Sequence, residues 1–183
     1  MWIAEGFIVV LTSCTGMVLR SFEGVTPTVH ESARVDETAV VIGDVTIEKD
    51  ASIWPHVTLR GDSGEIVVRE GTNVQDNAVC HEGCEIGPYA TVGHTAIVHA
   101  ATVGERAMVG MSATVLDEAY VGERSLVAAG SVVTEGTQVP SETMVAGSPA
   151  EVRKKVSDSP WAYAGDHYVE LAQRHEESSE RIE

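Results

Sequence analysis

Basic residues are scarce in this sequence. Its 183 residues include 12 lysines and arginines against 28 aspartates and glutamates, for a formal net charge of -16. The only lysines are Lys49, Lys154 and Lys155. A strongly acidic surface repels phosphate backbones and anionic lipid head groups. We therefore expect neither nucleic acid nor a membrane among the partners.

Cysteine is also scarce. The three cysteines, Cys14, Cys80 and Cys84, cannot all pair, and their spacing does not resemble a disulfide framework. A reducing, cytoplasmic location is the resulting expectation. The apolar run Phe7–Leu11 lacks a preceding basic segment and a cleavage signal, and it is too short to cross a bilayer. Residues 1–16 are interpreted as an extension of no known role.

A six-residue rhythm dominates the rest of the chain. Three residues are added around 61–64, and one is missing near Ala100. A small or branched companion follows four residues after each aliphatic one, from Ala33 to Pro149, with Thr102 in this slot after Val98. The aliphatic positions are Val29, Val35, Val41, Ile47, Ile53, Leu59, Val68, Val74, Cys80, Ile86, Val92, Val98, Val103, Val109, Val115, Val121, Val127, Val133, Val139 and Val145.

A period of six fits neither a helix at 3.6 residues per turn nor an alternating strand. It indicates a solenoid of short strands joined by turns, with the aliphatic and small residues facing inward. Three hexads complete one triangular coil, so eighteen residues raise the chain by one rung of about 4.8 Å. The fold class predicted is an all-β solenoid, a parallel β-helix of about seven coils over residues 29–150. Residues 1–28 form an extension and a lead-in strand.

The rhythm stops after Ala150. Residues 151–183 are predicted to form a C-terminal helix and tail, with Pro160–Arg174 helical and lying back along the solenoid. Glu151–Lys155 is interpreted as a solvated turn, and Glu176–Glu183 as a fraying end.

Three histidines stand out within the rhythm. His81 and His99 are eighteen residues apart, so they occupy equivalent positions one rung apart, above Arg60. Two such imidazoles can share one cation, since Zn–N bonds are about 2.0–2.1 Å. His94 lies in another slot, eighteen residues after Asp76, and around a corner of the triangle. We expect it to complete a neighbour's site in a threefold trimer.

Three neutral histidines with an open position are typical of catalytic zinc, whereas a structural site closes all four positions. The same ligands would also accept iron(II) or cobalt(II).

Three segments, ASIWPHVTLRGD, TNVQDNAVCH and VGHTAIVHAATVG, resemble the gamma-class carbonic anhydrases, with similarity over 29–155 and the trailing helix. The resemblance implies a left-handed winding, against the usual crossover rule. It implies a homotrimeric lyase that reversibly hydrates carbon dioxide to bicarbonate, with zinc or iron bound by His81 and His99 of one chain and His94 of the next. Gln75 would orient the metal-bound hydroxide or bicarbonate.

The resemblance also assigns Arg60, Asp62 and Asp76 to an ion-pair network between subunits. Tyr168 on the last helix resembles a tyrosine that shorter family members place near the metal. The chain departs from the family archetype because the acidic loop with its proton-passing glutamate is missing between His81 and His94.

Alternatives remain open. Cys80 and Cys84 flank His81, but both occupy inward slots and are expected to be core thiols. The same solenoid is used by hexapeptide-repeat acyltransferases, which bind acyl-CoA between subunits. A thioesterase of coenzyme A esters and a non-catalytic accessory subunit are further possibilities, because fold alone does not settle activity.

Overall fold

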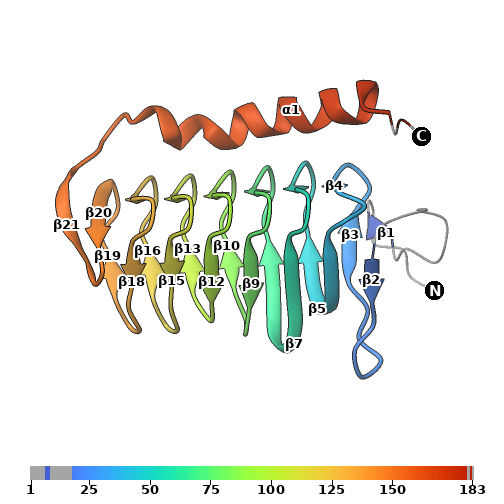
Figure 1. Cartoon of the computed structure of the whole chain (residues 1–183), viewed down its shortest axis with the longest axis horizontal. Coiled ribbons are helices and arrows are strands. Elements are labelled where there is room, and N and C mark those ends of the chain that lie inside the picture. Colours follow the sequence, from blue (N-terminus) through green and yellow to red (C-terminus); the bar gives the residue numbers. More distant parts are fainter. Residues whose placement is uncertain (1–6, 9–17, 181, 183) are drawn as a thin grey trace.

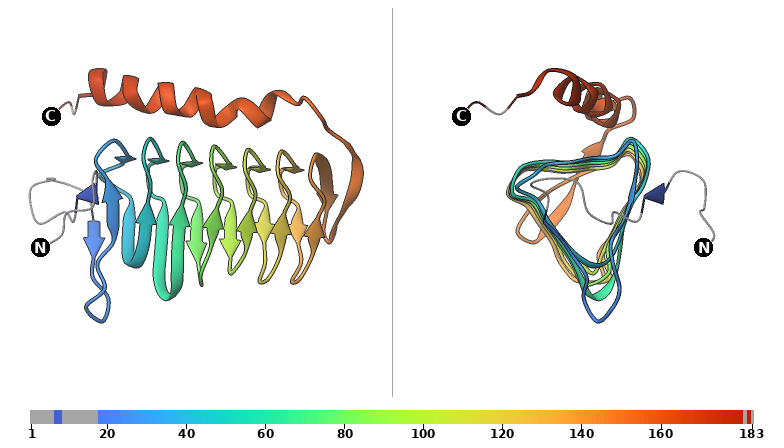
Figure 2. Two further views of the ribbon diagram at one scale, coloured as in Figure 1. Left: turned by 180° about the vertical axis from the view of Figure 1, so that it is seen from behind. Right: turned by 90° about the vertical axis from the view of Figure 1, so that its right-hand side faces the viewer.

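The computed structural model describes residues 7–8, 18–180 and 182. The chain forms a triangular prism of stacked coils with one helix beside it (Figure 1). The prism is a left-handed parallel β-helix of about seven turns with a C-terminal helix, which confirms the predicted fold class. Viewed along the axis, the coils superimpose as a triangle and the helix lies over one side (Figure 2).

The first face of the prism carries the strands that lead to the candidate histidines. Neighbouring strands of this face are parallel, and each pairs with the next strand in the list below. At the N-terminal end, β2 (Val18–Arg20) pairs with β5. The strands are β5 (Val40–Ile47), β7 (Thr58–Val68), β9 (Val79–His81), β12 (Ile97–His99), β15 (Thr114–Val115) and β18 (Val132–Val133).

The second face continues from the ends of β5 and β7, which turn the corner without a break. In Figure 1, β7 extends beyond the neighbouring coils because it contains the three added residues. The other strands of this face are β3 (Thr28–His30), β10 (Glu85–Ile86), β13 (Thr102–Val103), β16 (Tyr120–Val121) and β19 (Gln138–Val139), and β1 (Phe7–Ile8) pairs antiparallel with β3.

The third face is the side under the helix. Its strands are parallel except the last, which folds back antiparallel on its neighbour. They are β4 (Arg34–Val35), β6 (Ser52–Ile53), β8 (Asn73–Val74), β11 (Thr91–Val92), β14 (Met108–Val109), β17 (Leu126–Val127), β20 (Thr143–Gly147) and β21 (Ala150–Lys155).

The hexad residues fill the inside of the prism. Every predicted inward aliphatic residue is buried except Val35, which is only partly buried. The missing residue falls before Ala101, so Ala101 faces inward and Thr102 faces outward; the expectation for Thr102 was wrong by one position. Pro149 is exposed because the chain has already left the last coil.

Corners of the coils require left-handed backbone conformations. Thr95, which directly follows His94, has φ of 59°. Its backbone N–H donates to the carbonyl of Asp76 one rung below, at 2.9 Å. Such inter-rung hydrogen bonds offset the roughly 1–2 kcal/mol that a left-handed residue costs. At Gly61 a side chain is excluded, since a Cβ there would collide with the carbonyl oxygen of Asp44.

The C-terminal segment differs in part from expectation. Glu151–Lys155 belongs to the exposed strand β21, so its interpretation as a turn was wrong. The helix is confirmed: a 3-10 turn, η1 (Pro160–Tyr163), leads into α1 (Ala164–Ser178), which contacts β4, β6 and β8. It ends four residues beyond the predicted Arg174, so residues 176–178 are helical and not part of a fraying end. Among the described residues, no helix combines the length and apolarity needed to cross a bilayer.

Two clusters attach α1 to the prism. At its N-terminal end, Arg106 donates two hydrogen bonds to Asp166, at 2.6 and 3.2 Å, and lies over the ring of Tyr89. The bond from Arg106 lowers the pKa of Asp166. Further along the helix, Trp54 makes edge contacts with Tyr168 and His175.

We expect Val103→Ala to lower the free energy of unfolding by about 1–3 kcal/mol, because it removes two buried methyl groups from the core. Its neighbour Thr102 faces outward, and Thr102→Ala should change the same quantity by less than about 0.5 kcal/mol. Urea unfolding of both variants measures the difference. Equal losses would contradict the assigned inward register.

Candidate functional site: a histidine and carboxylate cluster

The cluster begins where β9 and β12 end on the first face. His81 and His99 are direct register partners, and Arg60 is the partner of His81 one rung below. The Nδ1 atom of His81 lies 3.3 Å from Nε2 of His99, and the ring centroids are 5.1 Å apart. The eighteen-residue spacing thus brings the two imidazoles together on the outside of one corner.

A carboxylate holds the second nitrogen of each of these rings. Asp117 Oδ1 lies 2.6 Å from His99 Nδ1, and Asp62 Oδ1 lies 3.1 Å from His81 Nε2. A proton on Nδ1 of His99, donated to Asp117, leaves the Nε2 lone pair free to bind a cation. Carboxylate partners of this kind orient metal-binding imidazoles and raise their basicity.

Arg60 completes this side of the cluster. Its guanidinium donates to Asp62 Oδ2 at 2.7 Å and lies 3.2 Å from Nδ1 of His81. The hydrogen bond from Arg60 lowers the pKa of Asp62, and the contact with His81 lowers it further. Asp62 is therefore an anion at neutral pH and remains an acceptor for both neighbours.

His94 lies apart from the pair, at the corner between the third and first faces. Its Nδ1 is 2.8 Å from Asp76 Oδ2, eighteen residues earlier, so it also has a carboxylate partner. Within one chain Asp76 therefore contacts His94, not Arg60 or Asp62. Sharing of a site between subunits, and a network that includes Asp76, stay predictions.

The donor atoms fit a metal. One nitrogen of His81, one of His99 and a carboxylate oxygen of Glu82 all lie within 4.8 Å of one another. Such a set of two imidazoles and a carboxylate suits zinc or iron(II). Glu82, which directly follows His81, has no counterpart in the family motif and was not proposed as a ligand from the sequence.

Gln75 and Tyr168 lie together, on the third face. The buried Gln75 amide donates to Asn73 Oδ1 at 3.0 Å, and Asn73 donates to Thr91 Oγ1 at 2.9 Å. Gln75, His94 and Tyr168 line one hollow of about 500 Å³. Burial raises the pKa of Tyr168, and Asp76 raises it further, so the phenol remains protonated at neutral pH.

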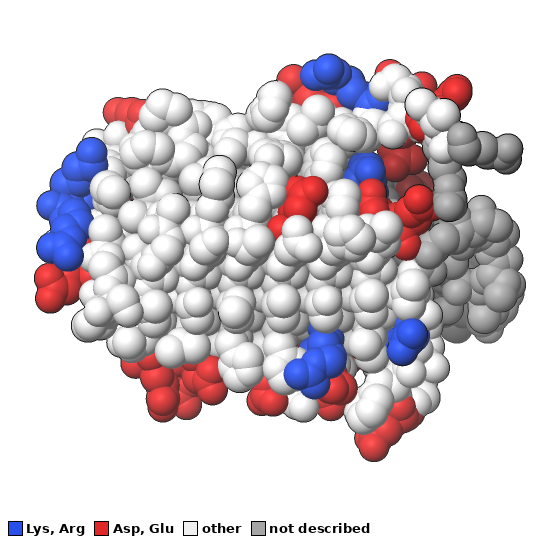
Figure 3. All heavy atoms as spheres, in the orientation of Figure 1, with Lys and Arg blue, Asp and Glu red and all other residues white. Residues whose placement is uncertain are grey.

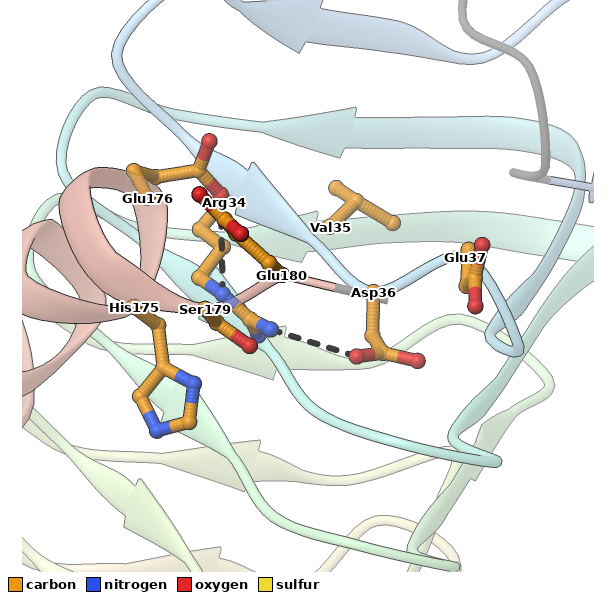
Figure 4. A pocket seen from close by; sticks show the side chains of 8 residues that line it. All are labelled: Arg34, Val35, Asp36, Glu37, His175, Glu176, Ser179 and Glu180. Atoms are coloured by element: carbon orange, nitrogen blue, oxygen red, sulfur yellow. Dashed lines mark hydrogen bonds and ion pairs between the residues drawn. The ribbon is translucent and has the colours of Figure 1, made fainter. Parts of the chain in front are cut away.

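Arg34 secures the far end of α1, and with it the helix that carries Tyr168. Figure 4 shows Arg34 between Asp36 and Glu176, at 3.2 and 3.5 Å, in a separate hollow of about 370 Å³. The guanidinium lies 4.6 Å from the centroid of Trp54, whose ring also contacts Tyr168. Docking of the helix therefore fixes the position of Tyr168 beside Gln75.

Both described cysteines are core thiols. Cys84 Sγ donates to the carbonyl oxygens of His81 and Val98, at 2.9 and 3.1 Å, and so contacts the backbone at the ends of β9 and β12. Burial raises the pKa of Cys80 and Cys84, which keeps both protonated. Cys14, with most of residues 1–16, lies outside the described residues.

Sequence reasoning missed Asp117. An eighteen-residue spacing could have indicated the contact between Asp117 and His99, because the same spacing separates the contacting pair Asp76 and His94. However, register alone pairs His99 with Leu116 across the missing residue. Only the direction of the Asp117 side chain brings it to the ring.

Hexads wound left-handed into a prism, with a polar cluster outside one corner, define a hexapeptide-repeat protein. Curated relatives include the carnitine operon protein CaiE of Escherichia coli O1:K1 / APEC, 39% identical over 142 residues, 75% of this chain and 72% of that protein. The Shigella flexneri serotype 5b protein of the same name matches equally well. No family model matches the chain.

Solved structures agree with this. A hexapeptide transferase family protein from Anaplasma phagocytophilum is 42% identical, with a TM-score of 0.83 over 85% of this chain and 96% of that one. A putative acetyltransferase from Bacillus cereus is 26% identical, also with a TM-score of 0.83, over 89% and 99%. The chain belongs to the hexapeptide-repeat left-handed β-helix family that includes CaiE and the hexapeptide transferases.

Asp117→Asn should weaken zinc binding by about 10- to 100-fold, because the amide keeps the shape but not the charge that supports His99. Chelator competition measures the affinity. Glu118→Gln, one residue further and exposed, removes the same charge away from the ring and is the matched control. Equal affinities for the two variants would mean that Asp117 does not support the metal.

Proposed function

We propose that the protein reversibly hydrates carbon dioxide to bicarbonate, with a divalent metal held by His81 and His99 of one subunit and His94 of the next. The observation that carries this proposal is the convergence of His81 and His99, with Asp117 and Asp62 on their other nitrogens. His94 has the same carboxylate support but no imidazole neighbour in its own chain among the described residues. A site shared between subunits would use all three histidines.

The cofactor proposed is zinc, with iron(II) or cobalt(II) as chemically equivalent occupants. When bound, such a metal supplies hydroxide at neutral pH, because it lowers the pKa of water to about 7. Gln75 would orient the reacting oxygen atoms through its amide, which Asn73 holds in place. Tyr168, protonated at neutral pH, would donate a hydrogen bond at the same position.

A homotrimer is proposed because the first face provides an uncharged surface between the histidine corners. Its outward residues Val79, Ile97, Thr114 and Val132 follow one another up the rungs, and Ile97 is 39% exposed. Figure 3 shows a broad area of the prism without charged side chains, bordered below by carboxylates. In a chain with a net charge of -16, such a surface favours self-association over exposure to solvent.

Acyl transfer or thioester hydrolysis is the second candidate. Two structures with TM-scores of 0.83 are described as a hexapeptide transferase family protein and a putative acetyltransferase. The hollow beside His94 is also larger than carbon dioxide requires. Acyl transfer and thioester hydrolysis could both use the proposed metal and its open coordination position.

Stopped-flow hydration of carbon dioxide, with metal analysis, tests the leading candidate. We expect turnover in protein loaded with zinc, or with iron(II) under anaerobic conditions, and its loss in His81→Ala and His99→Ala because the metal is lost. His56→Ala is the control, since His56 is outside the cluster. Turnover in neither metal form would leave the acyl reactions as the better proposal.

Sharing of the site between subunits has its own test. His94→Ala and His81→Ala chains should each be inactive alone, because every site lacks one ligand. Co-refolded mixed trimers should regain one intact site each, where a His94→Ala chain contributes His81 and His99 and its neighbour contributes His94. Metal retained at full occupancy in His94→Ala alone would contradict the shared geometry.

A further inference from the structure

The hollow beside His94 is a groove along the third face, parallel to the axis of the prism. It extends from β8 to β20 and has a volume of about 500 Å³. Gln75, His94 and Tyr168 form its polar end. Among the described residues, no aspartate, glutamate, lysine or arginine lines it, although the chain is rich in acidic residues.

The floor of the groove away from His94 is apolar. Met108 pairs with Leu126, and Leu126 pairs with Met144, so their outward side chains form one column over three rungs. Below Met108 the same column continues with Thr91 and Asn73, which are buried and hydrogen-bonded to each other. The column therefore changes from polar to apolar at β14.

The extent of the apolar floor indicates the kind of ligand. Three rungs span about 10 Å at the strand spacing of a sheet. Carbon dioxide and bicarbonate need only the polar end. A groove of this size, largely apolar with a few polar groups at one end, is typical of a site for an amphipathic small molecule. Met108, Met111 and Met144 would adapt to a flexible aliphatic chain.

We propose that this groove binds the acyl chain of a medium-chain thioester, with the thioester carbonyl at the Gln75, His94 and Tyr168 end and the chain along Met108, Leu126 and Met144. The absence of charged lining residues matches an uncharged aliphatic chain. The polar end belongs to the site proposed above for the metal, so the inference rests on the second candidate activity, acyl transfer or thioester hydrolysis, and names its substrate class. Chain binding itself requires only the groove.

The test therefore uses metal-free protein and a series of coenzyme A thioesters with acetyl, butanoyl, hexanoyl and octanoyl groups. Calorimetric titration should show affinity rising by about two- to fourfold for each added methylene that becomes buried. The heat-capacity change should become more negative along the series. Equal affinity for acetyl and octanoyl esters would overturn the proposal, since only the coenzyme would then be recognised.

Ala129→Trp places a large ring in the groove from an exposed position and should weaken octanoyl-CoA binding at least about tenfold, with a much smaller effect on acetyl-CoA. Gln138→Trp, exposed on the second face, is the matched control. Leu126→Asn should flatten the chain-length dependence, and Leu126→Met should restore it. Unchanged octanoyl-CoA affinity in Ala129→Trp would place the ligand elsewhere and overturn the proposal.

Sedimentation of the same variants tests the competing occupant. Dissociation of Ala129→Trp, with Gln138→Trp still assembled, would show that a second copy of the chain fills the groove, and would also overturn the proposal. Because these measurements use metal-free protein, their failure leaves carbon dioxide hydration standing. Conversely, failure of the carbon dioxide assay would leave the proposed binding of the acyl chain unaffected.

Discussion

The hydrogen bonds between successive coils are the constraint on which the rest of the structure depends. Within the coils, each short strand pairs in parallel with the strand one turn later, so most residues eighteen apart are stacked neighbours. This register aligns the aliphatic columns inside the prism. The same register places His81 against His99 and Asp76 against His94 outside it. Core and candidate site therefore follow from one winding.

Each candidate histidine has its own carboxylate partner. Asp62, Asp76 and Asp117 each lie against one histidine, and Arg60 offsets part of the negative charge beside His81. Asp62 and Asp117 lie at the corner of His81 and His99, whereas Asp76 lies beside His94 at the other edge of the first face. In the proposed metal site, a dication bound by the ring nitrogens that face away from the carboxylates would balance this charge.

The helix divides the third face into two environments. Held by Arg106 at one end and by Trp54 with Arg34 at the other, α1 covers β4, β6 and β8 and brings Tyr168 beside Gln75. Beyond that cover the outward residues become apolar. His94 lies where this groove meets the first face, whereas His81 and His99 lie at the opposite edge of that face.

The sequence by itself determined the solenoid, its inward residues, the trailing helix and the pairing of His81 with His99, because a strict period specifies which residues stack. Only the tertiary structure decided that Asp117 holds His99, that Glu82 approaches the ring pair, that Ala101 replaces Thr102 inside, and that Glu151–Lys155 forms a strand. It alone revealed the groove. These features depend on side-chain direction at corners and on where the helix docks, and a linear spacing contains neither.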